Sequence, residues 1–264
     1  MYVQPVPLFF LLTGISSCYP ADIMIIRIEK IICPNFAERS SLMTNDRMEK
    51  YAKEVLENLK AVIYNSHFVY TSGKHGSAYL DKTAICLDPV AMKFLCHFLV
   101  QKIPDTVKMK IQVVVGPALA GIAVANTVVL TLNDFRLDAE PKIYFTWVEE
   151  DKKGEKSLRL TFQRIVKGKN VLLVDDVINT GHTLLSTIKL LEKLGARVLA
   201  VAALYNRAEY EPHLFDPIPV YSLITVKLQE TYSPEECPLC RKGVPINTEF
   251  GRGKEFLKQR GKSS

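Results

Sequence analysis

The chain has 264 residues, of which 48% are hydrophobic and 23% are charged, and its formal net charge is +6. This composition is that of an ordinary globular protein with enough apolar residues for one sizeable core. No apolar run reaches the roughly 18 residues that a transmembrane helix needs. The basic residues accompany no recognition motif, so we expect neither a membrane protein nor a nucleic-acid-binding protein.

The chain is expected to have three parts. Met43 has the character of a natural start before a helical pattern, so residues 1–42 are predicted to be an extension outside the fold. Residues 6–15 resemble the core of a signal peptide, but no Lys or Arg precedes them, so export is not favoured. A main domain is expected at 43–233 and a C-terminal segment at 234–264. The six cysteines form no disulfide framework, which favours a reduced, cytoplasmic protein.

The first expected elements are two helices. Apolar residues at helical spacing predict a helix over residues 46–63, capped by Asn45 or Asp46. A second helix is expected to begin at Asp88 and Pro89, because Asp at the cap and Pro in the first turn are a favoured pair. Its buried stripe is predicted to comprise Val90, Phe94, Leu95, Phe98 and Leu99.

Strands and helices then alternate along the chain. The expected elements are strand 111–115, a helix after Gly121, strands 142–148 and 170–174, helix 183–194 and strand 197–205. Short continuous runs such as Val-Val-Val are typical of strands buried on both faces. The pattern predicts an α/β fold with an open parallel sheet flanked by helices, in which ligands bind beyond the carboxyl ends of the strands.

One segment joins a buried strand, two acids and a loop of small polar residues that opens a helix. A loop that enters a helix presents free backbone N–H groups and the positive end of the helix dipole, which together favour a phosphate. Gly181 permits the tight backbone, while Asp175 and Asp176 suit the hydroxyls of a sugar. The segment predicts a ribose 5-phosphate site. The alternative is a strand that ends in a polar turn with Asp as a helix cap.

A second strand-to-helix turn contains a Gly-Pro pair. Backbone donors of such a turn can bind another anion, although a plain connection is the common alternative. The turn comprises Gly116, Pro117, Ala118, Leu119, Ala120 and Gly121.

These two segments resemble the ligand-binding motifs of the type I phosphoribosyltransferases. The acidic segment is similar to that family's 5-phosphoribosyl-1-pyrophosphate signature, and the Gly-Pro turn is similar to its pyrophosphate loop. The resemblance implies that Asp175 and Asp176 hold the ribose. It also implies two phosphate sites, one formed by Asn179, Thr180, Gly181, His182 and Thr183, and one by Gly116, Pro117, Ala118 and Gly121. His182 occupies a position that varies in the family, so it receives no separate role.

Residues 68–79 resemble the small N-terminal hood of orotate phosphoribosyltransferases, where a Ser-Gly-Lys turn and an aromatic residue line the base pocket. Lys74 and Tyr79 would then contact the base, although Lys74 also suits an ordinary surface position. Arg207 ends the strand beyond the phosphate loop, and a guanidinium there can pair with the carboxylate of orotate. The alternative is a salt bridge from Arg207 to Glu209 or Glu211.

Residues 149–157 form a strongly charged stretch between two strands. In orotate phosphoribosyltransferases a flexible loop at this point reaches the pyrophosphate of a neighbouring subunit, so Lys152 and Lys153 are candidates for that role. The sequence departs from the family pattern, because Trp147 and Val148 stand where Arg and Lys are frequent and the usual loop histidine is missing. A solvated charged hairpin is the alternative.

The resemblance implies a magnesium-dependent orotate phosphoribosyltransferase of pyrimidine biosynthesis. Orotate and 5-phosphoribosyl-1-pyrophosphate would give orotidine 5'-monophosphate and pyrophosphate, with Mg²⁺ bound through ligand and water oxygens rather than by an all-protein cage. Lys74, Lys152 and Lys153 would stabilise the leaving charge, and a loop acting across subunits implies a homodimer. Two alternatives are a transferase for another base and a non-catalytic sensor of 5-phosphoribosyl-1-pyrophosphate.

The C-terminal segment carries one Cys-x-x-Cys pair, Cys237 and Cys240. Structural zinc normally needs two further ligands at defined spacing, and the sequence displays no second pair. Zinc binding, redox chemistry and a purely structural tail therefore stay open, with the structural tail favoured.

Overall fold

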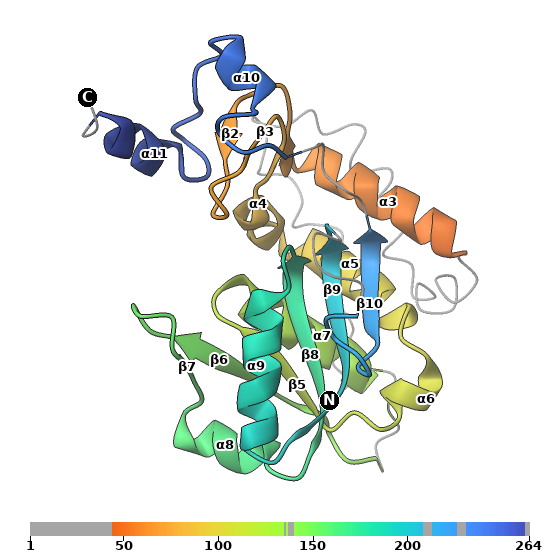
Figure 1. Ribbon diagram of the computed structural model, residues 1–264. Coiled ribbons are helices and arrows are strands. Elements are labelled where there is room, and N and C mark those ends of the chain that lie inside the picture. Colours follow the sequence, from red (N-terminus) through yellow and green to blue (C-terminus); the bar gives the residue numbers. More distant parts are fainter. Residues whose placement is uncertain (1–43, 135, 137–139, 208–212, 226–230, 262–264) are drawn as a thin grey trace, which may run out of the picture. The chain divides into compact units, whose positions relative to one another are not determined.

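The computed structural model describes residues 44–134, 136, 140–207, 213–225 and 231–261 (Figure 1). These residues belong to one compact unit that spans residues 44–264. The predicted extension at 1–42 lies outside the described residues.

A six-stranded sheet forms the centre of this unit, in the order β10-β9-β8-β5-β6-β7. All neighbouring strands are parallel except β6 and β7, which form an antiparallel hairpin. The predicted open parallel α/β sheet is thereby confirmed. The strands are β5 (Val113–Pro117), β6 (Tyr144–Glu150), β7 (Lys156–Ser157), β8 (Asn170–Ile178), β9 (Arg197–Asn206) and β10 (Val220–Thr225).

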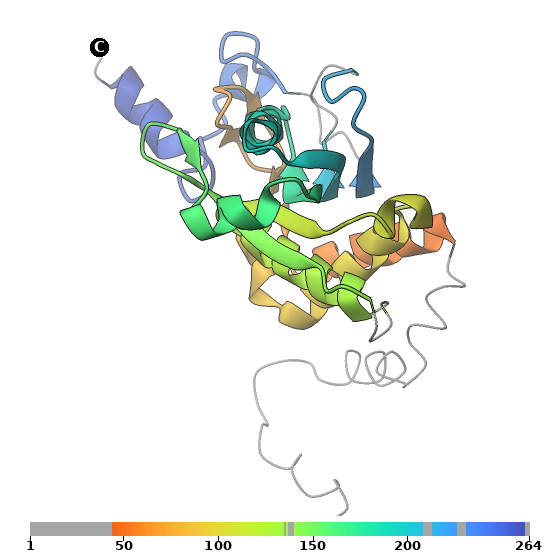
Figure 2. The same ribbon diagram turned by 90° about the horizontal axis from the view of Figure 1, so that it is seen from below.

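Helices cover both faces of the sheet (Figures 1 and 2). The helices α8 (Leu160–Val166) and α9 (His182–Lys193) lie on one face, where they share a buried apolar cluster with β5, β8 and β9. The other face is covered by α3 (Asn45–Asn58), α5 (Pro89–Gln101) and α7 (Ala120–Asp134). The short helices α4 (Lys82–Leu87) and α6 (Asp105–Lys108) flank α5 in the sequence.

Three details of the predicted helices are wrong. The first helix ends at Asn58 rather than at 63, because Lys60 adopts a left-handed φ of 51° and the chain then forms β1 (Val62–Ile63). Its N-cap is Thr44. The second helix begins as predicted, with the Asp88 carboxylate accepting hydrogen bonds from the amides of the first turn, but Val90 is exposed rather than part of the buried stripe.

Two small antiparallel pairs form the hood over the sheet. The strand β1 pairs with β4 (Tyr79–Leu80), and β2 (Phe68–Val69) pairs with β3 (His75–Gly76). The predicted small N-terminal hood is confirmed.

The C-terminal segment, with α10 (Pro238–Arg241) and α11 (Gly253–Arg260), packs on the β2–β3 pair. His75 and Tyr232 exchange both backbone hydrogen bonds, at 2.8 and 2.9 Å, and the amides of Asn247 and Arg252 each donate to a carbonyl at β2, at 2.8 Å. The hood is therefore built from two parts of the chain that are far apart in sequence.

No helix among the described residues is both long enough and apolar enough to span a membrane.

Candidate functional site

A cavity of about 620 Å³ lies at the carboxyl ends of the central strands, bounded by the hood and the β6–β7 hairpin. This is the edge of the sheet at which open parallel α/β folds bind ligands. Its lining comes from five separate segments: residues 70–72, 117–121, 150–151, 175–184 and Arg207.

Two carboxylates from β8 line the cavity. Asp175 and Asp176 are 7% and 2% exposed, because the strand continues through both acids to Ile178 instead of ending at 174 as predicted. One oxygen of Asp175 accepts the amide of Asp176 at 2.9 Å, and one oxygen of Asp176 accepts the amide of Val177 at 2.8 Å. These bonds fix both carboxylates at the end of a rigid central strand.

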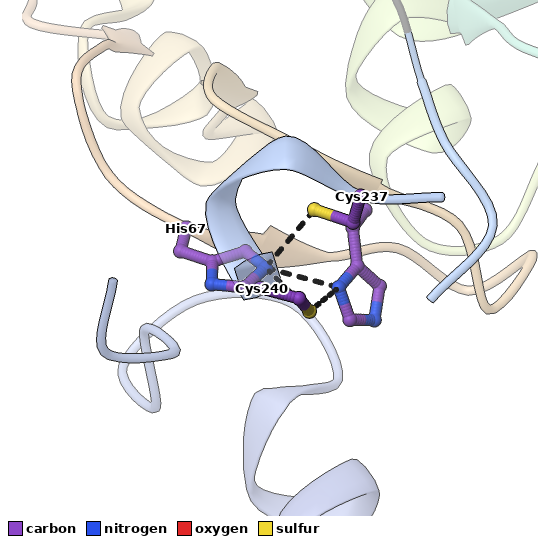
Figure 3. Close-up of side chains that lie close together, drawn as sticks. His67, Cys237 and Cys240 are labelled. Atoms are coloured by element: carbon purple, nitrogen blue, oxygen red, sulfur yellow. Dashed lines mark hydrogen bonds between the residues drawn. The ribbon is translucent and has the colours of Figure 1, made fainter. Parts of the chain in front are cut away.

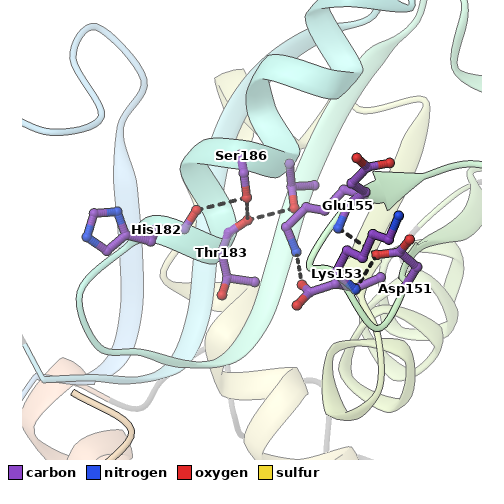
Figure 4. A network of polar contacts seen from close by, with 9 residues as sticks. Asp151, Lys153, Glu155, His182, Thr183 and Ser186 are labelled. Atoms are coloured by element: carbon purple, nitrogen blue, oxygen red, sulfur yellow. Dashed lines mark hydrogen bonds and ion pairs between the residues drawn. The ribbon is translucent and has the colours of Figure 1, made fainter. Parts of the chain in front are cut away.

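The loop after β8 leads into the N-terminus of α9. Gly181 is the N-cap residue and has a φ of 75°, a conformation that only glycine adopts without strain. As a glycine, this N-cap residue has no side chain to occupy the amides of the first turn of α9. The Ser186 hydroxyl donates a hydrogen bond to the Thr183 carbonyl within the helix, as Figure 4 shows. Residues Asn179 to Thr183 all line the cavity. The first-turn amides can therefore bind an anion there.

The Gly-Pro turn between β5 and α7 lies beside these acids. Gly116 packs against the backbone of Gly121, where any side chain would collide, so the strand and the helix approach closely. The Ala118 amide donates to the Val148 carbonyl at 2.9 Å, and the peptide bond between Ala118 and Leu119 is cis. Pro117, Ala118 and Gly121 line the cavity, whereas Gly116 shapes the turn from beneath.

Arg207 reaches the cavity from the end of β9. It is 7% exposed, and its guanidinium donates to the Asn179 side chain at 3.2 Å. The same guanidinium lies 5.1 Å from the centre of the Tyr70 ring. An arginine held this way presents a cation in a largely water-excluded setting. The alternative partners Glu209 and Glu211 lie outside the described residues.

Tyr70, like Glu150 and Asp151, lines the cavity although the sequence did not reveal it as a site residue. It follows β2, and its hydroxyl donates to the Ala78 carbonyl. A side chain at Gly76 would lie 2.9 Å from the ring, so this glycine makes room for Tyr70. The only available signal was the glycine itself, which lies six residues from the tyrosine that it accommodates.

The charged stretch is a short hairpin. Lys156 pairs with Glu150 at 2.6 Å and Arg159 with Glu149 at 2.8 Å. The Asp151 carboxylate accepts the amides of Lys153 and Glu155 at 2.8 and 2.9 Å and thereby closes the turn (Figure 4). A charged hairpin was the form that the sequence left open as the alternative to a flexible loop that reaches pyrophosphate.

Some predicted site residues do not line the described cavity. Lys152 and Lys153 are exposed on the hairpin, and Lys74 is exposed on the hood. The Tyr79 ring lies 5.4 Å from that of Phe68 and 5.6 Å from that of Phe250, which is a packing position. The roles predicted for these four residues stay predictions.

The fold is that of an α/β protein with a ligand site at the carboxyl ends of its parallel strands, and comparison with known proteins identifies its family. Residues 87–233 match the family model of the phosphoribosyl transferase domain. The chain belongs to the phosphoribosyltransferase family, as its motifs predicted.

Several of the similar proteins are orotate phosphoribosyltransferases. The chain is 34% identical over 184 residues to that of Caldicellulosiruptor bescii, covering 70% of this chain and 88% of the relative. It is 30% identical over 201 residues to that of Thermotoga maritima, covering 76% and 98%. The crystal structure of the Aeropyrum pernix orotate phosphoribosyltransferase superposes with a TM-score of 0.55 at 25% identity, covering 67% of this chain and 93% of that chain.

Proposed function

We propose that the protein transfers the phosphoribosyl group of 5-phosphoribosyl-1-pyrophosphate to orotate, giving orotidine 5'-monophosphate and pyrophosphate in pyrimidine biosynthesis. The observation that carries this proposal is the convergence of Asp175, Asp176, the α9 N-terminus, the Gly-Pro turn and Arg207 on one cavity. The relatives from Caldicellulosiruptor bescii and Thermotoga maritima, of which this chain covers 88% and 98%, support the choice of orotate as acceptor.

The site residues would act mainly by placement and charge. The ribose hydroxyls would donate to the two buried carboxylates, and the 5'-phosphate would accept the amides at the start of α9. The pyrophosphate would then lie at the turn of Pro117 to Gly121. As the bond at the anomeric carbon breaks, positive charge develops on the sugar, and the fixed carboxylates of Asp175 and Asp176 favour it.

The acidic lining fits the Mg²⁺ expected from the family. Glu150, Asp151, Asp175 and Asp176 offer only oxygen ligands, the kind that Mg²⁺ prefers, in a cavity with room for its water molecules. When bound, Mg²⁺ would neutralise charge on the pyrophosphate. Lys152 and Lys153 are proposed to reach the leaving group in a homodimer, from the exposed turn of the hairpin.

No disulfide joins the described cysteines Cys86, Cys96, Cys237 and Cys240. This is consistent with a reducing, cytoplasmic location.

The proposed reaction is tested by the loss of orotate absorbance with the full chain, 5-phosphoribosyl-1-pyrophosphate and Mg²⁺. We expect turnover at about 1 to 10³ s⁻¹, the usual range for enzymes, and little turnover when Mg²⁺ is omitted. Uracil and adenine serve as competing acceptors. Faster conversion of either would reassign the acceptor, and no conversion of any base despite calorimetric binding of 5-phosphoribosyl-1-pyrophosphate would indicate a sensor.

Replacement of Arg207 by Lys is expected to raise KM for orotate by about 10- to 100-fold, because Lys keeps the charge but loses the two-pronged pairing with a carboxylate. Steady-state kinetics with each substrate varied in turn measure this. Arg197→Lys, at the exposed opposite end of the same strand, is the matched control. An equal rise in KM for 5-phosphoribosyl-1-pyrophosphate would instead point to disturbance of the loop at Asn179.

A further inference from the structure

Four metal-ligating side chains converge between the β2–β3 hairpin and α10, and none of them lines the cavity. His67 and His75 come from the β2–β3 hairpin, and Cys237 and Cys240 come from the α10 turn. One ligand atom of each lies within 4.8 Å of all the others. Three of the residues are fully or almost fully buried, and Figure 3 shows His67, Cys237 and Cys240 directed toward a common point.

Three nitrogen–sulfur distances match a tetrahedral metal site. The His67 Nε2 atom lies 3.5 Å from the Cys237 sulfur and 3.7 Å from the Cys240 sulfur, and the His75 Nδ1 atom lies 3.3 Å from the Cys240 sulfur. Zinc bonds of about 2.3 Å to sulfur and 2.0 Å to nitrogen, at tetrahedral angles, place donor atoms roughly 3.3 to 3.8 Å apart. The two nitrogens, at 2.9 Å, need to separate by only a few tenths of an ångström.

Hydrogen bonding alone does not account for this arrangement. The His67 Nδ1 atom is 2.8 Å from the Val244 carbonyl, so it carries the proton and leaves one lone pair on Nε2. Three groups contact that lone pair: the two thiols and the His75 ring. One lone pair cannot accept three good hydrogen bonds, whereas a cation at the centre accepts an electron pair from each ligand.

The surroundings of the ligands also fit a metal. A carbonyl that accepts the second nitrogen of a ligating histidine fixes its tautomer and orientation, as the Val244 carbonyl does for His67. The backbone holds the hairpin and the turn together independently, through the paired His75 and Tyr232 and through the Asn247 amide. Two thiolates and a divalent cation have no net charge, which suits a buried position.

We infer that His67, His75, Cys237 and Cys240 bind a structural Zn²⁺ ion that fastens the C-terminal segment to the hood. Two sulfur and two imidazole ligands in a tetrahedron select zinc over Mg²⁺, whose oxygen ligands lie in the separate cavity. The hairpin that supplies both histidines also carries Tyr70, Thr71 and Ser72 into the cavity lining. The metal would therefore hold one wall of the substrate site in place without contacting substrate.

The test uses the full chain, purified without a histidine tag, and neither substrate. Elemental analysis is expected to find about one zinc per chain. Exchange with Co²⁺ alone is expected to give the visible absorption of tetrahedral cobalt and a thiolate charge-transfer band. Cys240→Ser is expected to lose the zinc and the charge-transfer intensity, and its Tm should fall by roughly 10 °C. Cys86→Ser, which removes an exposed thiol outside the cluster, is expected to retain all three properties.

The measurements on the unaltered chain do not depend on whether a variant folds. Substoichiometric zinc with no tetrahedral cobalt spectrum overturns the inference, as does an isolated protein with a Cys237–Cys240 disulfide. Zinc content unchanged in Cys240→Ser overturns it as well. Because no readout involves orotate, failure here is distinct from failure of the proposed transferase activity.

Discussion

Replacing both Asp175 and Asp176 by asparagine is expected to lower kcat/KM for orotate by about 10²- to 10⁴-fold. Hydrogen bonds to a charged group contribute about 1.5 to 3 kcal/mol each, and two such groups are neutralised. The asparagine oxygen can still accept the amides of Asp176 and Val177, so the backbone of β8 should be retained. The amide nitrogen, by contrast, is a donor and cannot accept a ribose hydroxyl. Steady-state kinetics and thermal unfolding of the same preparations measure both properties.

The matched control for this double substitution is Asp105→Asn. The Asp105 side chain is 83% exposed and forms an ion pair with Lys108, three residues further along the chain. This substitution should leave kcat/KM within about twofold, as expected for a surface change. A double variant that retained wild-type kcat/KM and Tm would remove the two carboxylates from the proposed mechanism.

The Gly181→Ala substitution is expected to raise KM for 5-phosphoribosyl-1-pyrophosphate by about tenfold or more. An alanine at a φ of 75° costs roughly 1 to 2 kcal/mol in backbone energy. The new methyl group would also lie 2.6 Å from Leu214 and 2.8 Å from Phe215, so the loop must shift. A shift there misplaces the amides that are proposed to bind the 5'-phosphate.

Gly195→Ala separates these two effects. Gly195 has a φ of 81°, but an added methyl group meets nothing closer than 3.8 Å. Both variants should lose similar stability, because each places an alanine in the left-handed backbone region. Only Gly181→Ala should weaken substrate binding. Equal KM values in the two variants would contradict a phosphate site at this loop, and calorimetry of 5-phosphoribosyl-1-pyrophosphate binding gives an independent check.

The central sheet and most of the cavity could be predicted because their signals are local. The strand β8, both acids, the loop and α9 are consecutive in the sequence, and the β5–α7 turn is equally short. The predicted ends of the strands and helices were less accurate. Polar residues such as Asp175 usually end a strand, yet here β8 continues through them because β9 pairs along its length.

The hood could not be predicted in detail because its strands have two residues each and its partners are remote. Val62 and Ile63 fit the helical spacing of the preceding segment, and only pairing with β4 makes them a strand. The metal-ligand cluster joins His67 to Cys237, which are 170 residues apart. The spacing of residues in the sequence therefore indicated only the pair Cys237 and Cys240. The approach of Arg207 to Tyr70 is likewise a product of the tertiary fold.

The dependence of the hood on the C-terminal segment has a consequence for how the protein acquires its structure. During synthesis the α/β sheet can form once β10 has left the ribosome, because all six strands precede residue 226. The β2–β3 hairpin must wait longer, since its backbone partners are Tyr232, Asn247 and Arg252. A nascent or prematurely terminated chain therefore exposes an open hairpin edge, the kind of surface that invites misassembly. Residues that are translated after the sheet complete the wall of a pocket whose floor is already folded.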